Sequence, residues 1–206
     1  MIRKGYSLYL VRSAKYGTTF KMGTASQKLL VTWADTTPGV TGYYAAAQAF
    51  EFTDGNKTKT ATVPLVIDVN GQAQYWDITQ FGSAGKPSTR NEVIRAHAAL
   101  DACGYELFDT DRFNRNIVEN KNRQSAQNLL YLAHNWDTSE LETESLMALV
   151  PGALTVAQLA KKIVRTETQT MVIALRLWLR NRVVLPLTTD YLQPAWMVRR
   201  ADHGYP

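Results

Sequence analysis

The sequence has little of the chemistry from which metal and redox sites are built. One cysteine, Cys103, stands among 206 residues, which excludes an internal disulfide and any zinc site made of several cysteines. The three histidines, His97, His134 and His203, are isolated, so a site of clustered imidazoles is not expected. No run of eighteen apolar residues occurs and no signal-peptide pattern follows Met1, so we expect no membrane partner. The expected location is the cytoplasm, or a particle assembled there.

The charge is basic overall but unevenly distributed. The chain carries 23 Lys and Arg against 18 Asp and Glu, a net charge of +5. Between Thr155 and Arg200, eight cations stand against two anions, whereas residues 139–150 hold three glutamates and no cation. This basic balance permits nucleic-acid binding without requiring it, and double-stranded DNA is the candidate partner. The candidate DNA-binding residues are Lys161, Lys162, Arg165, Arg176, Arg180, Arg182 and Arg199.

The pattern of residues 62–79 is typical of a β-hairpin. Two runs rich in β-branched and aromatic residues meet at Asn70-Gly71, a strong tight-turn dipeptide. A helix over about 90–102 is then predicted, with Ser88 or Thr89 as its N-cap and Gly104 as its C-cap. A strand at 105–109 and a helix at about 125–135 follow, and a strand is expected at 48–52. This order predicts an α/β core.

The segment beyond Trp136 has a different pattern, so we predict two domains, 1–137 and 138–206. Helices are expected at 139–150, 155–164 and about 167–181, followed by short strands at 183–185 and 196–198. This is the order of a winged helix-turn-helix; a simple amphipathic helical bundle is the alternative. In a winged domain the third helix usually enters the major groove, where it would bring Thr168, Gln169, Thr170, Arg176 and Arg180. Alternatively, these arginines form a solvated face or anchor the acidic first helix.

Several segments together resemble the TnsA-type endonucleases of heteromeric transposons. Residues 94–100 and 104–107 resemble the helix and strand that follow the family's active-site lysine. Arg112-Phe113 and residues 128–132 resemble the end of its nuclease domain, and residues 154–160 and 185–188 resemble its winged domain. The resemblance implies a restriction-endonuclease-like, PD-(D/E)XK core followed by a small winged helix-turn-helix domain. Nucleases of this class cleave DNA with Mg²⁺ held by carboxylates and with a lysine on the hairpin, which supplies positive charge at the reacting phosphate.

The positions that the resemblance marks as catalytic carry the wrong residues. The catalytic glutamate would stand near residues 26–30, but no acid occurs between Ala14 and Ala34. The aspartate falls at Leu65 and the lysine at Thr79, so cleavage is not expected to carry over. Two residual acids, Asp68 and Asp77, either shape the turn and the strand end or form a relocated metal site. In a shifted alignment, they would form a working site with Lys86.

Three functions remain open from the sequence. The leading hypothesis is a catalytically inactive TnsA-like subunit that binds DNA, partner proteins or both in a transposition complex or other mobile-element complex. Its protein partners would be a transposase and an AAA+ regulator, and no cofactor is expected. The first alternative is a head-completion component of a tailed phage, in contact with capsid or neck proteins. The second is an active endonuclease that requires Mg²⁺.

Overall fold

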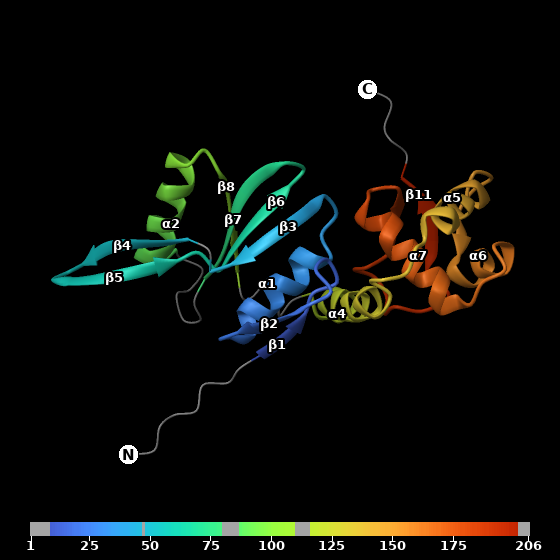
Figure 1. The fold of residues 1–206 in the computed structure, drawn as a ribbon, viewed down its shortest axis with the longest axis horizontal. Helices are drawn as coiled ribbons and strands as arrows, with labels where there is room; N and C mark the ends of the chain where they lie inside the picture. Colours follow the sequence, from blue (N-terminus) through green and yellow to red (C-terminus); the bar gives the residue numbers. More distant parts are fainter. Residues whose placement is uncertain (1–8, 47, 80–86, 110–115, 202–206) are drawn as a thin grey trace, which may run out of the picture. The chain divides into compact units, whose positions relative to one another are not determined.

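The chain is a mixed α/β protein. The computed structural model describes residues 9–46, 48–79, 87–109 and 116–201 (Figure 1). They divide into two compact units: unit 1 is Met1–Val11, Thr19–Asp35 and Val40–Ile117, and unit 2 is Arg12–Thr18, Thr36–Gly39 and Val118–Pro206. This division precedes the predicted boundary at 137/138, because helix α4 (Ile117–Leu132) contributes Ala126 and Leu130 to the core of unit 2.

A four-stranded sheet forms the centre of unit 1. Its order is β3 (Val40–Ala45), β6 (Leu65–Val69), β7 (Gln72–Ile78) and β8 (Gly104–Phe108). The first three strands are antiparallel neighbours, whereas β8 runs parallel to β7. A parallel neighbour requires a crossover connection, and α2 (Thr89–Leu100) lies in the chain between these two strands.

The predicted hairpin is confirmed as β6 and β7. Asn70 and Gly71 both have positive φ, 52° and 83°, as a tight type I′ turn requires. The Gly71 N–H donates to Oδ1 of Asp68 at 2.7 Å, so Asp68 shapes the turn. The register pairs Leu65 with Trp76. Along each strand, successive side chains point to opposite faces of the sheet.

Two helices cover the opposite faces of this sheet (Figure 1). Helix α1 (Ala25–Asp35) shares one core cluster with Leu65 and Trp76. Helix α2 shares another cluster with Tyr75, the neighbour of Trp76 in β7. Two separate strand pairs are β1 (Tyr9–Arg12) with β2 (Thr19–Met22), and β4 (Ala49–Asp54) with β5 (Lys57–Thr62). The second pair lies in unit 1, whereas the connection between β1 and β2 belongs to unit 2.

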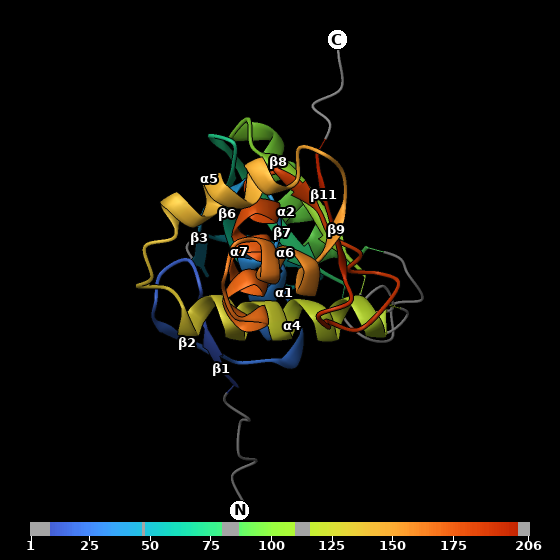
Figure 2. The ribbon, with the colours of Figure 1, turned by 90° about the vertical axis from the view of Figure 1, so that its right-hand side faces the viewer.

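Unit 2 contains the three helices and the terminal strand pair that the sequence predicts. Its elements after α4 are α5 (Ser139–Ala148), β9 (Leu154–Thr155), α6 (Val156–Lys162), α7 (Glu167–Leu179), β10 (Val183–Val184) and β11 (Met197–Arg200). The sequence did not indicate β9, which completes a sheet in the order β10-β11-β9. Figure 2 shows α7 among α4, α5 and α6, and every residue from Thr170 to Leu175 is buried.

Some predicted boundaries were wrong. Helix α4 begins at Ile117 rather than near Ser125, because buried polar residues support its first turns; the Asn122 amide donates to two loop carbonyl groups at 2.7 Å. Helix α2 ends at Asp101 as its C-cap, and Gly104 begins β8 instead. Arg112 and Phe113 lie outside the described residues. None of the helices in the described ranges is both long enough and apolar enough to span a bilayer.

Candidate functional site

Asp77 at the end of β7 is enclosed by protein donors. Its side chain is fully buried, and Oδ1 accepts from Nη1 of Arg90 at 2.7 Å and from the Ile78 N–H at 2.8 Å. Oδ2 accepts from Nδ2 of Asn91 at 2.6 Å and from the Tyr105 hydroxyl at 3.3 Å. Both carboxylate oxygens therefore bind two donors each, so a cation would have to displace protein groups to reach them.

The N-terminus of α2 brings two of these donors to Asp77. Ser88 caps the helix and accepts from the Asn91 N–H, while Asn91 accepts from Ser88, which completes a capping box. Of the two N-caps that the sequence predicted, Ser88 and Thr89, the structure has Ser88. The Asn91 amide also donates to the Ile78 carbonyl at 3.2 Å, so this one buried side chain joins α2 to the strand end.

Tyr105 on the neighbouring strand β8 closes the same cluster. Burial raises the pKa of its hydroxyl above the ordinary value, and the negative charge of Asp77 raises this pKa further. The phenol therefore keeps its proton and remains a donor to the carboxylate. Arg90 supplies the opposing charge, and its second terminal nitrogen donates to the Thr62 carbonyl.

An open cavity of about 540 Å³ lies beside this cluster. Its walls come from the start of α1, from β5, from the ends of β6 and β7, and from α2. The lining residues are Thr24, Ser26, Gln27, Thr60, Thr62, Pro64, Ile78, Thr79 and Arg90. Arg90 carries the one formal charge among these residues, and none of the described lining residues is a carboxylate. The cavity therefore presents hydroxyl, amide and guanidinium groups, which are poor ligands for Mg²⁺.

Only some of the positions that the sequence marked as catalytic line this cavity. Gln27 and Thr79 line it, so neutral side chains stand where an acid and a lysine are expected. Leu65 is buried in the core on the α1 side, and its neighbour Pro64 lines the cavity instead. The register keeps Asp68 at the turn, opposite Ala73 and away from Asp77. Lys86 lies outside the described residues, so the shifted arrangement stays a prediction.

Arg176 of α7 and Arg180, the C-cap of this helix, both contact other groups of unit 2, although the Arg180 side chain is 63 % exposed. Arg176 donates to the Trp136 carbonyl at 2.7 Å, to the Ala133 carbonyl at 2.6 Å and to the Thr138 hydroxyl. Burial lowers its pKa. Arg180 forms an ion pair with Glu142 of α5, whose other carboxylate oxygen accepts from Thr138. These contacts match the predicted alternative in which the arginines anchor the acidic helix.

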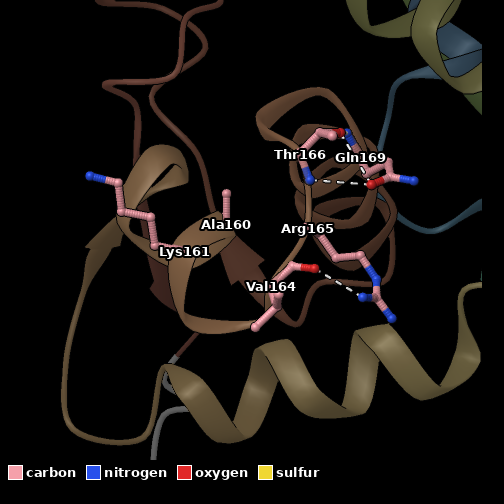
Figure 3. A pocket seen from close by; sticks show the side chains of 6 residues that line it. All are labelled: Ala160, Lys161, Val164, Arg165, Thr166 and Gln169. Atoms are coloured by element: carbon pink, nitrogen blue, oxygen red, sulfur yellow. Dashed lines mark hydrogen bonds between the residues drawn. The ribbon is translucent and has the colours of Figure 1, made fainter.

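The other predicted DNA-binding residues are exposed. Lys162 donates to the Ala148 carbonyl at the end of α5, at 2.8 Å. Lys161 and Arg165 flank an open cavity of about 640 Å³ between α6 and α7, and they point to opposite sides of it (Figure 3). Arg182 and Arg199 lie on the terminal strand pair, since Arg199 pairs with Val184 of β10 and the Arg182 carbonyl accepts from the Ala201 N–H.

Within the ranges that the structure describes, no group of three or more His, Cys, Asp and Glu side chains is arranged to hold a metal ion. No protein-family model matches this sequence, and no curated protein is similar enough to count as a relative. The geometry of the two regions is therefore the basis for assigning a function.

The residues that seal Asp77 were not identified from the sequence. Asn91 gave a usable signal, because it lies three residues after Ser88, where a capping partner stands. Arg90 and Tyr105 gave none, because their approach to Asp77 depends on how α2 and β8 pack on β7.

Proposed function

We propose that the chain is a catalytically inactive TnsA-type protein, with a PD-(D/E)XK core and a winged helix-turn-helix domain. It binds duplex DNA in the nucleoprotein complex of a transposon or other mobile element. There it positions a transposase and its AAA+ regulator without cutting DNA itself.

The arrangement of unit 1 supports the nuclease-like part of this proposal. The chain order α1, β3, β6, β7, α2 and β8, with the last strand parallel to its neighbour, is the order expected of the resembled core. The β4–β5 hairpin is an insertion between β3 and β6. The cavity at the ends of β6 and β7 lies where the resemblance expects catalysis.

The ion pair between Arg90 and Asp77 is the observation that carries the proposal of inactivity. A cleaving site needs a carboxylate that is open to Mg²⁺ and to the water of the reaction. Here a guanidinium neutralises the one acid at the end of β7, and Asp77 has no exposed surface. Gln27 and Thr79 provide neither a second carboxylate nor a lysine.

The arrangement of unit 2 supports DNA binding by a winged domain. Three helices and a small antiparallel sheet stand in the order of that fold. Three exposed arginines, Arg182, Arg199 and Arg200, share the β10–β11 pair, where a wing would touch phosphates. Arg176 is withdrawn from this role by its contacts within the unit, and the exposed Arg180 is paired with Glu142.

Binding of the full chain to a 30-base-pair duplex, measured by fluorescence anisotropy over a range of salt concentrations, tests DNA binding. The Arg182→Ala/Arg199→Ala variant should bind more weakly, and the slope of log affinity against log salt should fall by about two, since each phosphate contact contributes about one. A matched control removes Lys21 and Lys57, two exposed lysines of unit 1. Equal slopes for the wild type and the arginine variant would contradict the assignment, as would an equal fall in the control.

A further inference from the structure

Val164 in the turn between α6 and α7 has a backbone conformation that is costly for its residue type. Its φ is +54°, in the left-handed region that a β-branched residue rarely occupies. Its side chain is 79 % exposed, so it contributes little to the core that would offset this cost. Ala102 and Asn181 have a similar φ at the same place, directly after a helix C-cap, so the conformation belongs to the helix end. The unusual feature of Val164 is an exposed β-branched side chain at such a position.

The turn fixes this conformation from both sides. Ile163 is buried at the end of α6, and the Arg165 N–H donates to the Ala160 carbonyl at 2.9 Å. Thr166 then caps α7 through a capping box with Gln169. A glycine at position 164 would meet these backbone requirements without strain. The backbone of the turn therefore does not require a valine side chain at this position.

The surroundings of Val164 fit a nucleic-acid surface. Val164 and Ala160 give the open cavity an apolar part, and Lys161 and Arg165 stand on its two sides (Figure 3). Thr166 and Gln169 add polar groups. The cavity thus combines an exposed apolar side chain with two cations spaced on either side of it.

Helix α7 has little other surface with which to contact DNA. Residues from Thr170 to Leu175 are buried, whereas Glu167 and Thr168 in its first turn are exposed. Any contact between this helix and a DNA groove must therefore use its N-terminal turn and the residues that precede it. In the major groove, the apolar group that bases present is the thymine methyl.

We propose that the α6–α7 turn is the base-reading element of this protein, with Val164 against a thymine methyl and with Lys161 and Arg165 on phosphates. This inference rests on the proposed DNA binding and deepens it. It predicts a preference for duplexes with thymine in the contacted groove, although α7 itself is largely core.

Replacing thymine by deoxyuridine tests the proposal, because this change removes only the methyl group. The probes are a 24-base-pair duplex of alternating A and T and its counterpart with deoxyuridine at every T position. The wild-type chain should bind the uracil duplex about fourfold more weakly, the effect of one buried methyl-sized group. Val164→Gly should bind both duplexes equally, at the level of the wild type on uracil.

The matched control is Asn181→Gly in the same unit, another exposed residue with positive φ, at +56°. It should keep the wild-type preference for thymine. Val164→Gly should unfold at the same temperature as the wild type or higher, since glycine relieves the strain, so weaker binding will not reflect misfolding.

Other outcomes separate this inference from the proposed function. A thymine-to-uracil ratio of one in the wild type, with arginine-dependent DNA binding intact, would overturn the reading element alone. The same ratio in the wild type and Val164→Gly would also overturn it and favour a protein-docking role for the turn. No binding to either duplex would overturn the proposed function as well.

Discussion

The end of β7 in unit 1 and the α6–α7 turn in unit 2 differ in the environment of one residue each, Asp77 and Val164. Asp77 is fully buried, and both of its oxygens are occupied by protein donors. Val164 is 79 % exposed and has a strained backbone. The first region uses polar chemistry to hold the fold together, whereas the second leaves an apolar group and two cations open to solvent.

This difference shows where each region can act. The fold depends on the pairing of Asp77 with Arg90, because a buried charge that loses its partner is very unfavourable. The Asp77 carboxylate has no coordination site left for chemistry. The exposed Val164 side chain adds little to the core and is accessible from solvent. Under the proposed function, unit 2 acts by binding and unit 1 does not act by catalysis.

The largest effect is expected from breaking the sealed cluster. Arg90→Ala should lower the free energy of unfolding by about 3 kcal/mol, because it leaves the buried Asp77 carboxylate without its counter-ion. Urea denaturation followed by circular dichroism measures this change. Arg95→Ala is the control, since Arg95 is an exposed arginine of the same helix and should change stability by less than about 0.5 kcal/mol. Similar losses in the two variants would mean that the cluster is not structural.

The next effect concerns Arg176, which the sequence predicted as a DNA contact. Arg176→Ala should lower stability by about 2 kcal/mol, because charged hydrogen bonds to the Ala133 and Trp136 carbonyls are lost. Arg182→Ala should leave stability nearly unchanged and weaken DNA binding instead. The reverse pattern, with a stable Arg176→Ala that binds DNA poorly, would return Arg176 to the DNA interface.

A smaller loss is expected at the hairpin turn. Gly71→Val should lower the free energy of unfolding by about 1–2 kcal/mol, because a β-branched residue resists φ near +83°. A Cβ at this position meets no atom within 4 Å, so the loss reflects the backbone alone. Gly71→Asn should lose less, since Asn tolerates the left-handed region. Equal melting temperatures for all three proteins would contradict the tight turn.

The smallest effect is electrostatic. Hydrogen bonds from the Ser139 backbone N–H and hydroxyl lower the pKa of Asp137 below its ordinary value. Its contribution to stability is therefore present above the unfolded pKa and is lost as pH falls through the lower folded pKa. A ¹³C NMR titration of the carboxyl group should show the depressed value, and Ser139→Ala should raise it. Because Ser139→Ala removes only the hydroxyl bond, an unchanged titration would assign the lowered pKa to the Ser139 backbone N–H, and an ordinary pKa in the wild type would contradict the prediction.

Local signals in the sequence predicted much of this fold. Asn70-Gly71 located the hairpin, and the helix expected at 155–164 is present as α6, with Thr155 as its N-cap. The beginning of α4 was missed because its first turns look polar. Asn122 is buried there only because it binds the loop carbonyls of Leu187 and Asp190, far along the chain.

The sites were less predictable than the elements that carry them. The loss of acids and lysine from the expected catalytic positions was visible in the sequence. The sealing of Asp77 was not, because it depends on the packing of α2 and β8 against β7. The strain at Val164 was also invisible, because a left-handed φ at a valine follows from the helix ends on both sides and not from its own preference.

Incubation of the full chain with supercoiled plasmid and Mn²⁺ is the most direct test of a protein that binds DNA without cutting it. Agarose gels run with and without detergent report binding and nicking on the same sample. The predicted result is a mobility shift before detergent treatment and fully supercoiled plasmid after it. The opposite result, nicked circles that disappear with EDTA and in the Asp77→Asn variant, would contradict the account by showing that the carboxylate buried beside Arg90 takes part in cleavage.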